Sequence, residues 1–175
     1  MISIKQNLIY LSIVLFICSA FVQCRVSYSF TGASIPIEAK TFSVKRFENM
    51  ASTVNPLLSN TLTDQLYMRL NSSTSLSSSP LDADIAFEGT ITNYNVSPIA
   101  IQGGEATVAA QNRLTIGVKV KFQNRYDSKT NFDSSFSQYA DFDASKDFTG
   151  IEQSLVDEIV EKLVTDIFNK ALVNW

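Results

Sequence analysis

The sequence predicts an α+β fold in which two helices pack on one face of a four-stranded, largely antiparallel sheet, in the order β-α-β-β-β-α. Three observations support this fold class. Residues 113–122 alternate apolar and polar side chains, as a strand with one buried face does. Leucines recur at four-residue spacing between positions 58 and 70, and two adjacent apolar rows run from position 151 to position 172, as in amphipathic helices.

The chain begins with a segment typical of an export signal. Lys5 supplies the positive charge, and residues 8–17 form an apolar run of the length found in signal peptides. This run is shorter than the roughly 20 apolar residues that cross a bilayer. Counted through Val22 the segment is longer, which leaves an uncleaved anchor as the alternative. We expect a signal peptide over residues 1–23.

Cys24 ends this segment and is followed by a polar chain. The arrangement resembles the lipobox of bacterial lipoproteins, whose cysteine is acylated and becomes the first residue of the mature protein. Phe21 and Gln23 stand where that motif usually has a leucine and a small residue. Two or more acyl chains would hold the protein stably on a membrane. The alternative is a secreted protein with a free thiol at Cys24.

The composition excludes several functions. The chain contains no histidine, and its only cysteines are Cys18, inside the signal, and Cys24, the expected lipid site. Disulfides, thiolate or histidine catalysis and His/Cys metal sites are therefore not expected in the mature protein. The 17 acidic residues outnumber the 14 basic ones, which argues against a nucleic-acid partner. We expect no enzyme, cofactor or metal.

The length fits one folded domain. We expect residues 24–36 to form a lipidated tether and residues 37–175 a single α+β domain. The first strand is predicted over residues 39–47, where Phe42 and Val44 share one face and Thr41, Ser43 and Lys45 share the other.

A helix is predicted over residues 56–70, with Asn55 as its N-cap and proline at the first helical position. The Ser-rich stretch 71–80 reads as a mobile surface loop. The next strand is predicted over residues 84–96, ended by Pro98. The glycine pair at positions 103 and 104 predicts the turn into the following strand.

Residues 113–122 are the clearest strand of the chain. A polar hairpin loop over residues 125–131 leads into a strand over residues 131–139, so three strands form an antiparallel meander. The last helix is expected to begin with a capping box made by Thr149 and Glu152, and its apolar face extends to Trp175.

If both helices cover one face of the sheet, the other face is polar and locally basic. Arg113, Lys119 and Lys121 concentrate positive charge there in an acidic chain. One interpretation is an ordinary solvated face. The other is a surface that contacts an anionic or hydroxyl-rich partner, such as lipid phosphates or the polar lumen of a barrel.

Residues 141–152 have the ligand spacing of a calcium loop. Oxygen-bearing side chains stand at every second position, in Asp141, Asp143, Ser145 and Asp147, and Glu152 is the twelfth residue counted from Asp141. The sixth position is a lysine where that loop needs glycine, and the preceding residues have a strand pattern. We therefore interpret these acids as favouring the positive N-terminus of the last helix.

Four segments carry a resemblance to a known family. They are YSFTGASI at residues 28–35, NRLTI at residues 112–116, SQYADFDAS at residues 137–145 and DIFNKA at residues 166–171. Together they resemble a divergent branch of the LPS-assembly lipoprotein family LptE. The resemblance implies two helices against a four-stranded sheet, and a palmitate-bearing lipoprotein on the periplasmic face of the outer membrane.

The resemblance also implies a function without catalysis. A member of this family sits inside the barrel protein LptD and takes part in lipopolysaccharide transport to the cell surface. The expected partners are thus an LptD-type barrel, lipopolysaccharide and, through the anchor, the membrane. Arg113, Lys119 and Lys121 are the candidate contacts. The alternative is a stand-alone periplasmic lipoprotein that binds a small amphipathic ligand between its helices and its sheet.

Overall fold

The computed structural model describes residues 35–53, 55–99 and 110–173. The chain divides into two compact units, Met1–Phe30 and Thr31–Trp175, and every described element belongs to the second. The expected signal peptide, Cys24, the tether as far as residue 34, the turn at positions 103 and 104 and Trp175 lie outside the described residues. The elements are β1 (Thr41–Val44), β2 (Glu48–Asn49), α2 (Leu58–Ser73), β3 (Ser77–Ser78), β4 (Ile85–Ile99), β5 (Gln111–Asn124), the 3-10 helix η1 (Ser128–Thr130), β6 (Phe132–Asp143) and α3 (Phe148–Leu172).

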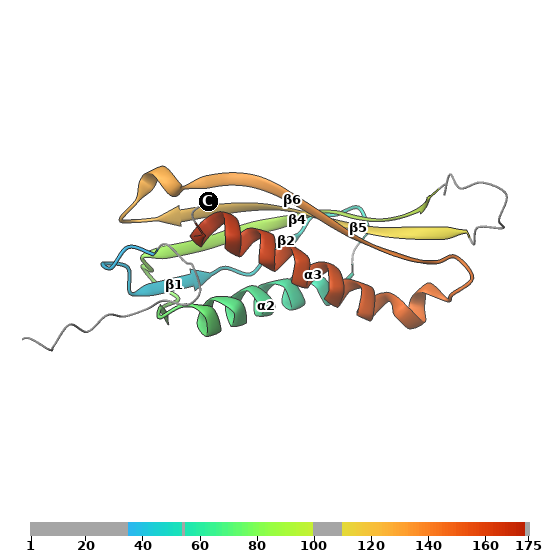
Figure 1. The fold of residues 1–175 in the computed structure, drawn as a ribbon, viewed down its shortest axis with the longest axis horizontal. Coiled ribbons are helices and arrows are strands. Elements are labelled where there is room, and N and C mark those ends of the chain that lie inside the picture. Colours follow the sequence, from blue (N-terminus) through green and yellow to red (C-terminus); the bar gives the residue numbers. More distant parts are fainter. Residues whose placement is uncertain (1–34, 54, 100–109, 174–175) are drawn as a thin grey trace, which may run out of the picture. The chain divides into compact units, whose positions relative to one another are not determined.

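The predicted α+β class is confirmed, with two helices and a mixed sheet (Figure 1). The strand order is β3-β1-β4-β5-β6, and β2 pairs with β4 beyond the end of β1. The expected meander of β4, β5 and β6 is antiparallel. β1 and β2 instead run parallel to β4, because α2 connects them as a crossover helix. The sheet therefore has six strand segments among the described residues, where four strands were expected.

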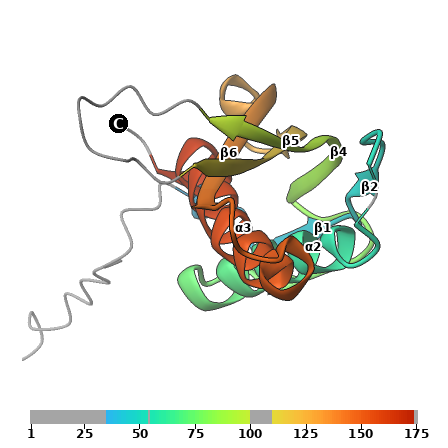
Figure 2. The same ribbon diagram turned by 90° about the vertical axis from the view of Figure 1, so that its right-hand side faces the viewer.

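Both helices cover the same face of the sheet (Figure 2). α3 contacts β5 and β6, α2 contacts β1 and β2, and the two helices contact each other. The core between these layers is filled by large side chains with no solvent exposure. Examples from each layer are Leu62 and Leu66 of α2, Phe87 of β4, Val118 and Phe122 of β5, and Ile159 and Leu163 of α3.

β5 follows its predicted alternation. Leu114, Ile116, Val118, Val120 and Phe122 are fully buried. The residues between them form the opposite face of the strand. Because β5 lies between β4 and β6 and pairs with both, its alternation sets the two faces of the sheet.

β4 is longer than predicted and changes its alternation halfway. Its register against β5 shifts between Ile91 and Asn93, so the buried positions move from Ile91 to Tyr94. Pro98 does not end the strand and pairs with Asn112. β2 pairs with β4 only as far as Ile91, so Pro98 lies where the other side of β4 has no described strand partner, a position that tolerates the missing N–H.

The Ser-rich stretch 71–80 is not the expected loop. α2 continues to Ser73, the side chain of Leu76 is buried, and Ser77–Ser78 pairs in parallel with Thr41–Phe42. The burial of Leu76 holds this segment against the core and brings its backbone to the edge of β1. Serine content alone did not reveal this pairing, because the decisive residue is a single leucine.

One of the two predicted helix caps is found. The side-chain oxygen of Asn55 accepts hydrogen bonds from the backbone N–H groups of Leu57 (2.9 Å) and Leu58 (3.1 Å), although α2 begins two residues later than expected. The predicted capping box of α3 is wrong. The residue before this helix, Asp147, makes no side-chain cap, and Glu152 is bonded elsewhere.

Candidate functional site

The candidate site is the face of the sheet that the helices leave uncovered. β5 places Lys119 and Lys121 on this face, since they alternate with the buried Val118 and Val120. No helix among the described residues is long and apolar enough to cross a membrane.

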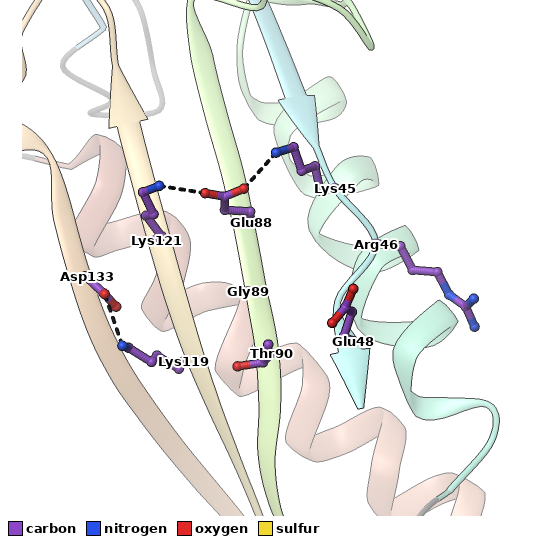
Figure 3. Close-up of a pocket in the computed structure, with 9 residues that line it drawn as sticks. All are labelled: Lys45, Arg46, Glu48, Glu88, Gly89, Thr90, Lys119, Lys121 and Asp133. Carbon is purple, nitrogen blue, oxygen red and sulfur yellow. Dashed lines mark hydrogen bonds and ion pairs between the residues drawn. The ribbon is translucent and has the colours of Figure 1, made fainter. Parts of the chain in front are cut away.

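Glu88 lies at the centre of this face, between two lysines (Figure 3). Its carboxylate accepts hydrogen bonds from the Nζ of Lys121 and the Nζ of Lys45, each at 2.8 Å. Glu88 and Lys121 are direct partners in the β4–β5 register, and Lys45 follows β1 on the other side of β4. The hydrogen bond from Lys121, followed by that from Lys45, lowers the pKa of Glu88 to about 2. Glu88 is therefore ionised at neutral pH.

Lys119 forms a second ion pair on the same face. Its Nζ lies 3.1 Å from the carboxylate of Asp133 on β6, and both side chains are about half exposed. These ion pairs line a shallow depression of about 460 Å³, together with Arg46, Glu48 and Thr90. Figure 3 shows the Arg46 side chain extending away from the Glu88 group. The depression has four basic and three acidic side chains, in a chain with a net charge of −3.

Arg113 belongs to a separate cluster. Its guanidinium forms two hydrogen bonds with Asp141, at 2.7 and 2.8 Å, and lies 3.6 Å from the centre of the Tyr139 ring. The hydrogen bond with Asp141 raises the pKa of Arg113 and lowers that of Asp141. Arg113 is six residues from Lys119 along β5, which corresponds to about 20 Å. The three predicted residues share a face but do not form one patch.

The acidic residues of the calcium-like segment 141–152 bind different partners in the protein. Asp141 pairs with Arg113, Asp143 accepts hydrogen bonds from the backbone and hydroxyl of Ser145, and Glu152 bonds to Asn55. Ser145 lowers the pKa of Asp143 by these bonds. In the part of the chain that the structure describes, no group of three or more acidic, histidine or cysteine side chains is placed to hold a metal ion.

Sequence reasoning missed the acidic half of this face. Glu88 follows the buried Phe87 in β4, and Asp133 alternates with half-buried residues in β6, which places both outward. Only the strand register shows which lysine each one contacts. The signal in the sequence is the recurrence of charges at outward positions of adjacent strands. Cross-strand pairing of opposite charges follows from it once the register is known.

The ionisable groups of this face form ion pairs around a shallow depression. The fold and this face define a small α+β domain with one open, charged face of its sheet. The family model of LptE, described as lipopolysaccharide-assembly, matches residues 39–171. The chain belongs to this family, whose members are non-enzymatic lipoproteins.

Solved structures with low sequence identity are similar to the chain. A putative neuraminyllactose-binding hemagglutinin homolog from Helicobacter pylori is 12% identical, with a TM-score of 0.52, and the alignment covers 82% of this chain and 91% of that one. A minor lipoprotein from Acinetobacter baumannii is 15% identical, with a TM-score of 0.45 and coverages of 77% and 96%. No curated protein sequence matches the chain significantly.

Proposed function

We propose that this protein is an outer-membrane lipoprotein that acts as the plug and partner of an LptD-type barrel in lipopolysaccharide transport. The observation that carries the proposal is the family match over residues 39–171, which spans nearly all of the α+β domain. The position of Cys24 after an apolar segment supports acylation at that residue and anchoring on the periplasmic face. Anchoring keeps the domain at a high effective concentration near the barrel.

The packing of the domain supports a role as a plug. The side chains between helices and sheet are fully buried at many positions, including Leu62, Phe87 and Val118. A closed core gives the domain a fixed shape and leaves its polar faces to contact a water-filled lumen. The same packing argues against the alternative function, because an amphipathic ligand between helices and sheet would have to displace these side chains.

The uncovered face supports contact with an anionic partner. Lys119 and Lys121 lie together at the depression, and Arg113 lies further along β5. The ion pair of Lys119 with Asp133 is about half exposed on both sides, and exposed ion pairs contribute little to stability. A phosphate group can therefore compete with Asp133 for Lys119 at small cost. The basic side chains would then compete with the divalent ions that bridge lipopolysaccharide phosphates.

Affinity purification from membranes tests the proposal. The full chain with a C-terminal tag is expected to co-purify with a much larger outer-membrane barrel, and its N-terminal peptide is expected to begin at Cys24 and to carry acyl chains by mass spectrometry. Recovery without a barrel would contradict the plug function. An unmodified N-terminus would contradict the anchor, so the two parts of the proposal are tested separately.

A further inference from the structure

A second depression lies beside the start of α2, and we call it the α2 depression. Its volume is about 360 Å³, and it is lined by residues 46–49, 55, 56 and 59. Arg46 lines both this depression and the one on the uncovered face, so the two adjoin. Figure 3 shows the Arg46 side chain directed away from Glu88 and toward the ribbon of the helix that follows β2, which is α2.

Hydrogen bonds hold the two sides of the α2 depression together. The hydroxyl of Thr63 accepts a bond from the backbone N–H of Phe47 at 3.1 Å and donates one to the carbonyl of Ser59 at 2.6 Å. The side-chain amide of Asn49 donates to the carbonyl of Asn55 at 3.4 Å. Phe47 has no solvent exposure. The walls of the depression are therefore fixed before any ligand binds.

The first turn of α2 leaves backbone donors without an acceptor. The side-chain oxygen of Asn55 accepts the N–H groups of Leu57 and Leu58. The N–H groups of Ser59 and Asn60 form no hydrogen bond with another described residue. The N–H groups at the start of a helix have no acceptor inside the helix, and they carry a partial positive charge. The N–H of Ser59 is therefore a donor at the wall of the depression.

The hydroxyl of Ser59 is a further donor. Ser59 is only 6% exposed, among the buried leucines of α2. Its hydroxyl makes no hydrogen bond within the part of the chain that the structure describes, and no side-chain oxygen there is sealed from water without a partner. The hydroxyl must therefore reach the depression that Ser59 lines. A bound acceptor would satisfy this nearly buried polar group.

Arg46 supplies positive charge to the α2 depression. The three lysines of the uncovered face pair with carboxylates, whereas Arg46 takes part in no ion pair among the described residues. Its guanidinium presents several N–H donors in one plane, a geometry that matches the oxygens of a phosphate. Glu48 also lines the depression, but its side chain is exposed and can turn toward water.

We propose that the α2 depression binds a phosphate group, with the guanidinium of Arg46, the N–H of Ser59 and the hydroxyl of Ser59 as its donors. Unpaired N–H groups and the helix dipole together favour an anion at this position. The site goes beyond the proposed function, which assigns phosphate contacts to the uncovered face, and it requires neither the lipid anchor nor the barrel. A lipid headgroup and a free phosphate ion present the same oxygens, and the experiment separates these two sources.

Amide NMR of the full chain in detergent micelles tests the site. Inorganic phosphate is expected to shift the Ser59 amide resonance until the site is saturated, and sodium chloride at the same ionic strength is not. Purified lipopolysaccharide is then used in place of inorganic phosphate. A shift of the same amide by lipopolysaccharide supports a lipid headgroup as the source of the phosphate. A shift by inorganic phosphate alone supports a free ion.

Variants show whether the shift depends on the proposed donors. Arg46→Gln should weaken binding by about ten-fold or more, because it removes a charged donor, and Ser59→Ala should weaken it by a smaller factor. The matched control is Arg69→Gln, which makes the same change of charge near the other end of α2 and should leave binding unchanged.

Two results would overturn the site. One is the absence of a saturable shift of the Ser59 amide with either probe, and the other is an equal loss of binding in Arg46→Gln and Arg69→Gln. Either result would leave co-purification with a barrel unaffected, because that measurement does not depend on the α2 depression. The site and the proposed function therefore fail by different readouts.

Discussion

The carboxylate of Glu152, in the first turns of α3, accepts a hydrogen bond from the buried hydroxyl of Tyr94 on β4. The same carboxylate oxygen accepts a bond at 2.7 Å from the side-chain amide of Asn55, whose own oxygen caps the start of α2. Burial and the bond to Glu152 raise the pKa of Tyr94, so its hydroxyl stays protonated as a donor. One carboxylate thus joins both helices to the sheet.

Tyr94→Phe is expected to lower the free energy of unfolding by about 1 kcal/mol, because it removes one hydrogen bond. Glu152→Ala is expected to cost about 2–3 kcal/mol, because the Tyr94 hydroxyl and the Asn55 amide both lose their acceptor. Urea unfolding measures both changes. Thr149→Ala is the control. A loss comparable to that of Glu152→Ala would show that Thr149 does cap α3 and would contradict this account.

Gly89→Ala is expected to destabilise the protein by about 1–3 kcal/mol. A Cβ at this position would lie 2.4 Å from the carbonyl oxygen of Lys119 and 2.7 Å from the ring of Phe47, which is fully buried. Gly150→Ala, in the first turn of α3, meets no atom closer than 3.7 Å and should be neutral or stabilising by up to about 1 kcal/mol. The midpoint of thermal unfolding is measured for both variants. A similar fall in the midpoint for Gly89→Ala and Gly150→Ala would contradict the expected difference between them.

The ion pairs of Glu88 are expected to make the stability of the protein depend on pH. Its pKa falls from 4.5 to about 2 through its bonds with Lys121 and Lys45. A group with a depressed folded-state pKa stabilises the protein above its unfolded pKa and loses this effect as the pH falls through the folded value. The difference in unfolding midpoint between the wild type and Glu88→Gln should therefore shrink between about pH 6 and about pH 2.

The control for this pH dependence is Glu161→Gln, on the exposed side of α3. Glu161 forms no ion pair within the described residues, so this variant removes one exposed carboxylate without breaking a contact to a lysine. A constant difference for Glu88→Gln would mean that the lysines do not hold the carboxylate in solution. Other carboxylates titrate equally in the wild type and in both variants, so their effects cancel.

The sequence correctly predicted those helices and strands whose apolar periodicity is contained in their own residues. The alternation of β5 and the leucine spacing of α2 are correct because burial on one face follows directly from these periods. The bulge of β4 between Ile91 and Asn93 was not predicted, since a shifted period looks like the end of a strand. The parallel pairing of β1 with β4 and of β3 with β1 depends on long-range packing that no local pattern contains.

The candidate site was likewise predicted only in part from the sequence. Outward positions of Lys119 and Lys121 followed from the alternation of β5. Their partners, Asp133 and Glu88, depend on two strand registers. The separation of Arg113 from the lysines follows from the strand's length, and its pairing with Asp141 shows that an acid assigned to a helix terminus belongs to the sheet.

Charge reversal of the sheet face is expected to weaken lipopolysaccharide binding. Lys119→Glu with Lys121→Glu should reduce affinity by about ten-fold or more, because the depression changes from net positive to net negative. Arg113→Glu should reduce it separately, and its effect should add to that of the lysines because the clusters are about 20 Å apart. Binding of purified lipopolysaccharide at low and high salt measures both effects, and screening should lessen them.

The matched control for the full reversal changes three lysines elsewhere, Lys129, Lys146 and Lys162, to glutamate. Lys129 lies in η1, Lys146 in the turn before α3 and Lys162 on α3, and all three are exposed, so the net charge changes equally while the sheet face stays intact. Unfolding midpoints of both triple variants must remain close to that of the wild type for the comparison to hold. Equal losses of binding would assign the effect to net charge. A loss confined to the reversal of Arg113, Lys119 and Lys121 would assign it to the uncovered face, since only there do the reversed charges share one surface.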